Sequence, residues 1–191
     1  EVTGWPPRRI RRLGVGRTFQ ITEVFGSMTV RENVQAALIA ARRESFRLFG
    51  RADRRHMDDA NALLDRIGLG EQAGRAAGEL AYGDVKRLEL AIAIANRPKL
   101  LLMDEPTAGM APAERAGLMQ LVSALVRETG MGVLFTEHDM DAVFGHADRL
   151  MVLHRGRVLA EGRPDEVRAD PRVREVYLGG ATLPDGRDKT R

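Results

Sequence analysis

The chain has 191 residues, of which 43% are hydrophobic and 30% charged, so it is long enough for one sizeable core or two small ones. This composition excludes an intrinsically disordered chain, and the absence of cysteine excludes a disulfide framework. The excess of 30 Lys and Arg over 27 Asp and Glu is too small to indicate nucleic-acid binding. The basic cluster at residues 8–12 could bind phosphate or lipid head groups, but a solvated helix face explains it better. No apolar run approaches the roughly 20 residues that span a bilayer.

The first half of the chain predicts mainly helices. Thr29 followed by Glu32 is a capping box, which marks the start of one of them. In chain order we expect a helix over 6–13, a strand over 15–19, and helices over 29–41, 57–67 and 84–96, with connectors over 42–55 and 71–79.

The second half alternates strands and helices, which predicts an α/β fold with a parallel sheet. We expect buried strands over 99–103 and 132–136, a further strand over 149–153 that turns into a hairpin at 158–160, helices over 112–128 and 139–145, two short helices within 164–178, and a tail over 179–191. The mostly helical stretch 29–96 then forms a subdomain inserted in the sheet.

Two acids follow the apolar run that starts at Leu100. Asp104 and Glu105 come at the carboxyl end of this predicted strand, the edge at which parallel sheets bind ligands. Because neighbouring strand residues point in opposite directions, one acid can hold a Mg²⁺ shell while the other orients a water, as in nucleotide hydrolysis. The alternative is that both acids cap the helix that begins near Pro112.

A glycine turn precedes the predicted helix at 84–96. In the run Leu80, Ala81, Tyr82, Gly83 and Asp84, small residues leave backbone N–H groups free at the positive end of a helix, a geometry that receives phosphate. An ordinary glycine-containing helix entry is the alternative reading.

Two single residues follow predicted strands. His138 comes just after the strand at 132–136, where it can reach a terminal phosphate or simply cap a helix. His56, His146 and His154 have no ligand spacing with it, which argues against a metal cluster. Gln20 ends the strand at 15–19 and is uninformative by itself.

The order and spacing of these features resemble those of the ATP-binding subunit of an ATP-binding-cassette (ABC) transporter. The features are Gln20, the turn at 82–84, the acids 104–105, the loop 108–112 and His138. The resemblance runs from about residue 2 to 179 and is greatest to the ATPase subunits of branched-chain amino acid importers. It implies a P-loop NTPase (RecA-like) ABC core that lacks its first strands, with an inserted helical subdomain. The implied parts are a core remnant at 1–20, the helical subdomain at 21–97, the α/β core at 98–162, and helices and tail at 163–191.

The resemblance also implies a role for each matched residue. Asp104 corresponds to the Walker B aspartate on Mg²⁺, Glu105 to the catalytic glutamate and His138 to the switch histidine. Gln20 corresponds to the Q-loop glutamine, which touches the metal and the water. The signature motif, which contacts ATP held by a partner subunit, corresponds to Leu80, Ala81, Tyr82, Gly83 and Asp84, and the D-loop to 108–112, including Ala108 and Gly109.

The signature motif departs from the usual Leu-Ser-Gly-Gly-Gln. Ala81 lacks the serine hydroxyl, Tyr82 replaces a glycine and Asp84 replaces the glutamine. The backbone N–H of Gly83 can still point at a phosphate. The charge of Asp84 weakens phosphate binding unless Lys86 or Arg87 offsets it.

The phosphate-binding loop G-x-x-x-x-G-K-[ST] does not occur in the sequence. We therefore expect an N-terminally truncated copy of the family's domain. In the family, a strand before that loop lies between those predicted here at 132–136 and 149–153. Without it, the strand at 132–136 should present an unpaired edge, and the isolated chain should be poorly soluble or partly molten.

The implied function is to bind and hydrolyse ATP and so power an importer of branched-chain amino acids or related amides. Expected partners are a second ATP-binding subunit, transmembrane permeases and, indirectly, a periplasmic binding protein, with no nucleic acid. The expected location is the cytoplasmic face of the inner membrane. Two alternatives stay open: a pseudo-ATPase module that lends only its signature motif to a composite site, and an ABC protein without a transport role.

Overall fold

The computed structural model describes residues 1–18, 24–42 and 56–177. Expectations that concern Gln20, the connector at 42–55 beyond its first residue, or the tail from 179 lie outside the described residues. The chain divides into two compact units, residues 1–138 and 139–191. Each unit is described by itself.

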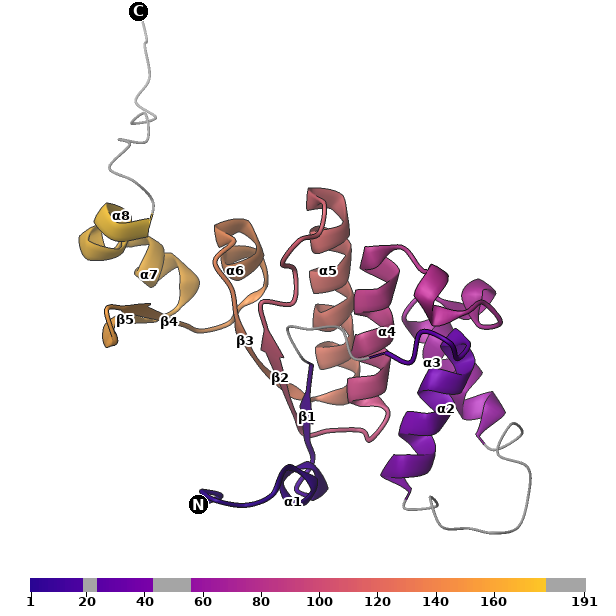
Figure 1. Ribbon diagram of the computed structural model, residues 1–191. Helices are drawn as coiled ribbons and strands as arrows, with labels where there is room; N and C mark the ends of the chain where they lie inside the picture. Colours follow the sequence, from indigo (N-terminus) through magenta and orange to yellow (C-terminus); the bar gives the residue numbers. More distant parts are fainter. Residues whose placement is uncertain (19–23, 43–55, 178–191) are drawn as a thin grey trace, which may run out of the picture. The chain divides into compact units, whose positions relative to one another are not determined.

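A three-stranded parallel sheet forms the centre of the first unit (Figure 1). Its order is β1 (Val15–Arg17), β2 (Leu100–Asp104) and β3 (Gly132–Thr136). β1 and β2 are neighbours in the sheet although a long helical segment separates them in sequence. This topology confirms the expected insertion of a helical region into a parallel α/β core.

Helices pack beside this sheet and beyond it. In Figure 1, α4 (Tyr82–Ile94) and α5 (Pro112–Thr129) lie next to the strands, while α2 (Val30–Ala41) and α3 (Met57–Arg66) lie on the far side of α4. The 3₁₀ turns η2 (Gly70–Gln72) and η3 (Ala77–Glu79) occupy the connector that leads into α4. The core therefore runs continuously from the sheet through α4 to α2 and α3.

Apolar side chains from every layer of the first unit make this core. β2 alternates, so that Leu101 and Met103 are buried on one face of the sheet. Helix residues complete the cluster, among them Val30, Val34, Leu64, Leu88, Leu90, Leu118, Val122 and Leu125. α4 contributes on several of its sides, which places it at the centre of the unit.

Helix ends follow the chemistry that the sequence predicts. Thr29 accepts a hydrogen bond from the Glu32 backbone N–H at 3.2 Å, and the Glu32 carboxylate accepts from the Thr29 backbone N–H at 2.7 Å, which confirms the capping box. The backbone N–H and the hydroxyl of Thr29 both donate to the Glu32 carboxylate and lower its pKa. Gly68 and Gly130 follow α3 and α5 with φ of 75° and 67°, a conformation that costs glycine little.

The second unit has two strands and three short helices. α6 (Met140–His146) precedes a hairpin of β4 (Leu150–His154) and β5 (Arg157–Gly162), and α7 (Pro164–Ala169) and α8 (Pro171–Tyr177) follow it. Leu150, Val167 and Val173 form its small core. The hydroxyl of Tyr177 donates a hydrogen bond to the Leu153 carbonyl, which ties α8 to the hairpin. The hairpin and the two short helices that follow it confirm the sequence prediction.

One expectation about the strands needs correction. β3 is not a buried strand, since Leu134 is 64% exposed. The exposure follows from β3 lying at the end of the sheet order, with β2 as its only paired strand in the described ranges. The unpaired edge expected for this strand is thereby confirmed.

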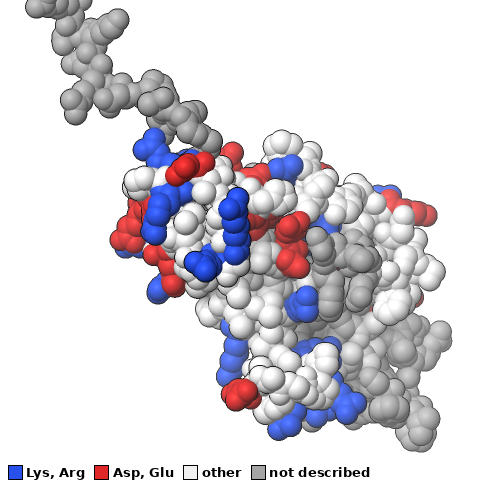
Figure 2. All heavy atoms as spheres, turned by 60° about the vertical axis from the view of Figure 1, so that its left-hand side comes forward, with Lys and Arg blue, Asp and Glu red and all other residues white. Residues whose placement is uncertain are grey.

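The basic cluster at residues 8–12 lies on α1 (Pro7–Arg12), a helix without a buried residue. The guanidinium of Arg9 stacks 3.5 Å from the centroid of the Trp5 ring. Figure 2 shows Lys and Arg side chains at the lower end of the molecule, the level at which Figure 1 draws α1. The cluster is therefore a solvated helix face, as the sequence favoured.

The exposed edge of β3 predicts self-association of the 191-residue chain. A lysine on an edge strand opposes pairing with another chain, so Leu134→Lys should raise the monomer fraction. Leu13→Lys is the matched control, because the Leu13 side chain is likewise exposed, at 52%, but lies outside the sheet. Size-exclusion chromatography with light scattering measures the effect. Equal monomer fractions in the two variants would contradict the role of the β3 edge.

Candidate functional site

Asp104 and Glu105 lie where β2 and β3 end together. The register places Asp104 opposite Thr136, and the Thr136 hydroxyl donates a hydrogen bond of 2.6 Å to Asp104 Oδ1. The backbone N–H of Glu105 continues the ladder by donating to the Thr136 carbonyl at 3.1 Å. Two strands thus fix the two acids. Neither acid caps α5, whose first turn is capped instead by Glu114 through the Ala111 N–H.

Glu105 has a strained backbone. Its φ of 44° lies in the left-handed region, which is unusual for a residue with a side chain and clusters at functional sites. Its Oε1 lies 3.8 Å from Nδ1 of His138, and the two side chains are 37% and 74% exposed. The structure therefore brings together the carboxylate and the imidazole that the sequence singled out, at an edge open to solvent.

Thr107 and Glu137 support this edge, and the sequence analysis did not assign them a role. Glu137 Oε1 accepts hydrogen bonds from the Thr107 backbone N–H at 2.9 Å and from its hydroxyl at 2.6 Å. Thr107 is only 1% exposed, so the bond fastens the loop after β2 to the segment after β3. Their positions in the sequence could have indicated this role, because both residues closely follow strands that end at the same edge of the sheet.

Residues 82–84 of the predicted glycine turn form the first turn of α4, which begins at Tyr82 rather than at the predicted residue 84. The N–H groups of Tyr82 and Gly83 consequently have no acceptor within the helix. Asp84 accepts a bond of 2.8 Å from Gln72 Nε2 and lies 3.8 Å from Arg87. Arg87 thus opposes the charge of Asp84, whereas Lys86 pairs elsewhere.

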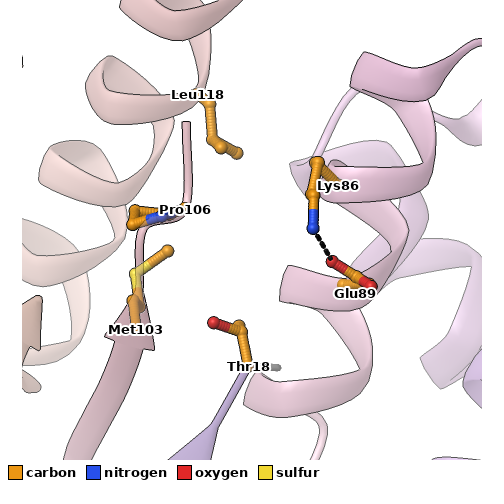
Figure 3. Close-up of a pocket in the computed structure, with 6 residues that line it drawn as sticks. All are labelled: Thr18, Lys86, Glu89, Met103, Pro106 and Leu118. Carbon is orange, nitrogen blue, oxygen red and sulfur yellow. Dashed lines mark hydrogen bonds and ion pairs between the residues drawn. The ribbon is translucent and has the colours of Figure 1, made fainter. Parts of the chain in front are cut away.

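Lys86 forms a buried ion pair with Glu89. Lys86 Nζ lies 3.0 Å from Glu89 Oε2, and the side chains are only 5% and 8% exposed. The second carboxylate oxygen, Oε1, is buried without a hydrogen-bond partner among the residues that the structure describes. Figure 3 shows the pair facing Thr18 and Met103 across a small cavity of about 10 Å³, with Pro106 and Leu118 completing the lining. The pair therefore lies where α4 meets the end of β1 and the loop after β2.

A second, open pocket of about 190 Å³ lies on the sheet beside Asp104. Its lining comes from all three strands: Arg17, Leu102, Met103, Asp104, Leu134 and Thr136. It opens at the carboxyl ends of parallel strands, the position at which open α/β sheets bind ligands.

The loop 108–112 leads from this edge into α5. The Ala108 N–H donates to the Glu105 carbonyl at 3.1 Å, and the Met110 N–H to the Thr107 carbonyl at 3.2 Å. The Ala108 carbonyl accepts a hydrogen bond from Tyr82 at 3.1 Å. The predicted signature and D-loop segments therefore touch within one chain. Gln20 lies outside the described residues.

No group of three or more His, Cys, Asp and Glu side chains within the described ranges is arranged to hold a metal ion. Asp104 nevertheless offers carboxylate oxygen, the donor that Mg²⁺ prefers, and Mg²⁺ typically takes one or two carboxylates together with phosphate oxygens and water. The residues present fit a metal that arrives with a nucleotide.

These features are typical of the α/β cassettes that hydrolyse nucleotides. They are a parallel sheet, two acids at its edge, a nearby imidazole and a helix N-terminus with free N–H groups. Comparison with known families agrees: residues 2–108 match the ABC transporter model, and residues 157–182 match the model for branched-chain amino acid ATP-binding cassette transporters. The chain belongs to the ABC transporter family, whose ATP-binding cassettes are transport ATPases.

Curated relatives point to one branch of this family. The chain is 40% identical to the high-affinity branched-chain amino acid transport ATP-binding protein LivG of Escherichia coli strain K12, over 95% of this chain and 74% of the relative. It is 39% identical, with the same coverage, to the BraF protein of Pseudomonas aeruginosa, which carries the same description.

Solved structures confirm the fold. The ADP conformation of an ATP-binding cassette of an ABC transporter matches with a TM-score of 0.77 at 30% identity, over 93% of this chain and 73% of that one. A dimeric cassette in a post-hydrolysis state, bound to ADP and Pi, matches with a TM-score of 0.67 at 28% identity, over 82% of this chain and 66% of that one. Within the described ranges, the helices all lack the length and apolar character needed to cross a membrane.

The buried pair predicts a large stability effect. Lys86→Met leaves Glu89 charged and buried without its partner, so the free energy of unfolding should fall by about 3–5 kcal/mol. The double variant Lys86→Met/Glu89→Leu should recover most of this loss, because no buried charge remains. Urea denaturation measures all three proteins.

A matched control is the exposed pair Arg66–Glu128, at 2.7 Å with side chains 40% and 63% exposed. Arg66→Met should lower the free energy of unfolding by about 1 kcal/mol or less. If Lys86→Met costs no more than this control, removing Lys86 does not leave an uncompensated buried charge on Glu89.

Proposed function

We propose that the chain is the ATP-binding and ATP-hydrolysing subunit of an ABC importer for branched-chain amino acids or related amides. The observation that carries the proposal is the cluster at the end of β2 and β3. There Asp104 is fixed by Thr136, and Glu105 faces His138 at 3.8 Å. The names of the LivG and BraF relatives support the substrate class. The two alternative readings find no support among these relatives.

Glu105 is proposed as the catalytic carboxylate. Phosphoryl transfer to water depends on positioning and on charge, and a carboxylate within reach of the water can orient it and accept its proton. The left-handed backbone of Glu105 and its ladder bond to Thr136 hold the side chain at the open edge. His138, on the neighbouring strand end, is proposed to contact the terminal phosphate.

The first turn of α4 is proposed to bind ATP held by a second ATP-binding subunit. The N–H groups at Tyr82 and Gly83 have no intrahelical acceptor, and they lie at the positive end of a 13-residue helix. Arg87 lies close enough to Asp84 to oppose its charge toward a phosphate. Ala108 and Gly109 belong to the same proposed surface, together with Leu80 and Ala81.

Asp104 and Gln20 are the residues proposed to hold Mg²⁺. When bound with ATP, the metal neutralises charge on the phosphate oxygens. Asp104 contributes a carboxylate whose Oδ1 is already positioned by the Thr136 hydroxyl.

The remaining parts of the proposal concern partners and location. We propose transmembrane permeases as direct partners, a periplasmic binding protein as an indirect one, and the cytoplasmic face of the inner membrane as the location. The functional division into parts 1–20, 21–97, 98–162 and 163–191 is proposed as well. Neighbouring genes for two permeases and a binding protein would support this assignment.

The 191-residue chain by itself should not turn over ATP. Its sequence has no phosphate-binding loop, and the backbone nest and lysine of that loop supply most of the positioning in phosphoryl transfer. A phosphate-release assay with ATP and Mg²⁺ measures turnover. Activity that Glu105→Gln abolishes would contradict the expectation.

A chimera that places the phosphate-binding loop of the LivG relative ahead of Glu1 tests the role of Glu105. Glu105→Gln should bind ATP as the parent chimera does but lose turnover by about 100-fold or more, because the amide keeps the shape and loses the proton acceptor. His138→Ala should also slow turnover. Equilibrium binding and phosphate release measure the two effects.

The control for this chimera is Glu175→Gln, at an exposed glutamate of α8, which should leave turnover unchanged. Turnover of the Glu105→Gln chimera at the parent rate would refute the proposed function.

A further inference from the structure

Tyr82 connects the first turn of α4 to the loop 108–111. Its hydroxyl donates a hydrogen bond of 3.1 Å to the Ala108 carbonyl. Its ring also covers Gly109, since a Cβ on that glycine would lie 3.4 Å from the Tyr82 Cε1 atom. Gly109 has a φ of 76°, so the loop bends at the point where the ring lies against it.

A second contact joins the same two segments. A Cβ on Gly83 would lie 2.8 Å from Glu114 Oε1, so the glycine lets the Glu114 carboxylate lie directly against α4. The other oxygen of Glu114 accepts the Ala111 N–H at 3.1 Å. Tyr82 thus contacts the start of the loop 108–111 directly, while Gly83 lies against Glu114, which binds the end of that loop.

The tyrosine ring is itself held from within α4. Lys86 Nζ lies 5.5 Å from the ring centroid, within the range of a cation–π interaction. Lys86 is in turn fixed by its buried ion pair with Glu89. Although Tyr82 is 46% exposed, contacts on two sides hold its ring.

We propose that Tyr82 is a positioning residue that fixes the loop 108–111 to the first turn of α4, so that the two segments move as one body. The functional part of this inference rests on the proposed function, because both segments are proposed to face the ATP site shared with a second subunit. The glycine that stands here in the usual signature motif has no side chain to make this link. In this chain the Tyr82 side chain transmits a change at one segment to the other.

Hydrogen exchange on the 191-residue chain tests the link without nucleotide. The Ala108 and Met110 amides are each bonded within the loop, so their exchange reports its order. Tyr82→Phe removes only the hydroxyl and should speed their exchange about two- to tenfold, the change expected from one net hydrogen bond. Tyr82→Gly removes the ring as well and should speed it further.

The matched control is Tyr177→Phe. The sequence has two tyrosines, and Tyr177 also donates its hydroxyl to a backbone carbonyl, that of Leu153. Tyr177→Phe should leave exchange at 106–111 unchanged. If Tyr82→Phe matches this control at 106–111, or speeds exchange equally in β2 and β3, the proposed link is wrong.

A fluorine NMR experiment approaches the link from the loop side. Chains grown with 3-fluorotyrosine should give two resonances, which Tyr82→Phe and Tyr177→Phe assign. Gly109→Ala should shift only the Tyr82 resonance, because the new methyl group lies in van der Waals contact with its ring. An unshifted resonance would overturn the contact. Neither measurement involves ATP, so the link stands or falls independently of the Glu105→Gln result.

Discussion

The in-register pairing of β2 with β3 is the constraint on which the candidate site depends. It places Asp104 opposite Thr136 and carries one ladder bond past the strand, from the Glu105 N–H to the Thr136 carbonyl. Since parallel strands end at one edge, His138, two residues beyond β3, comes within 3.8 Å of Glu105. A slip of one residue would turn Asp104 to the opposite face of the sheet. Backbone hydrogen bonds, rather than a contact between Glu105 and His138, therefore fix the positions of the candidate site residues.

α4 relates the rest of the first unit to that edge. Its apolar residues belong to the core shared with α2, α3 and α5, while Lys86 and Glu89 lie beside Thr18 and Met103 (Figure 3). A buried ion pair adds little net stability over apolar packing, but it is costly to break. Both residues belong to α4, three positions apart, so the pair satisfies charge within the helix and does not itself fix where α4 packs. The pair lines the small cavity that α4 shares with the end of β1 and the loop after β2.

Most of the fold could be predicted from local sequence signals. The features that could not be predicted depend on contacts between residues far apart in the sequence. The Thr29 capping box depends on neighbours in sequence, and the structure confirms it. The sequence predicts the start of α4 two residues too late, because Tyr82 and Gly83 have the character of a turn. Lys86 and Glu89 gave no sign of burial, since charged residues are rarely buried unless paired. The bonds from Thr136 to Asp104 and from Thr107 to Glu137 join residues about 30 apart, which no local pattern reveals.

The loop that follows Glu105 shows how a segment without regular structure gains a defined position. Its backbone is in the left-handed region at Glu105, where the loop begins, and again at Gly109. The path of the loop therefore continues neither the strand before it nor the helix after it. Three anchors compensate: Glu137 binds Thr107, Tyr82 binds Ala108, and Glu114 binds Ala111. Each anchor comes from a different segment, namely the end of β3, the first turn of α4, and the first turn of α5. The loop therefore connects the sheet edge to two helix N-termini. A displacement of any one of the three changes the contacts of the loop with the other two.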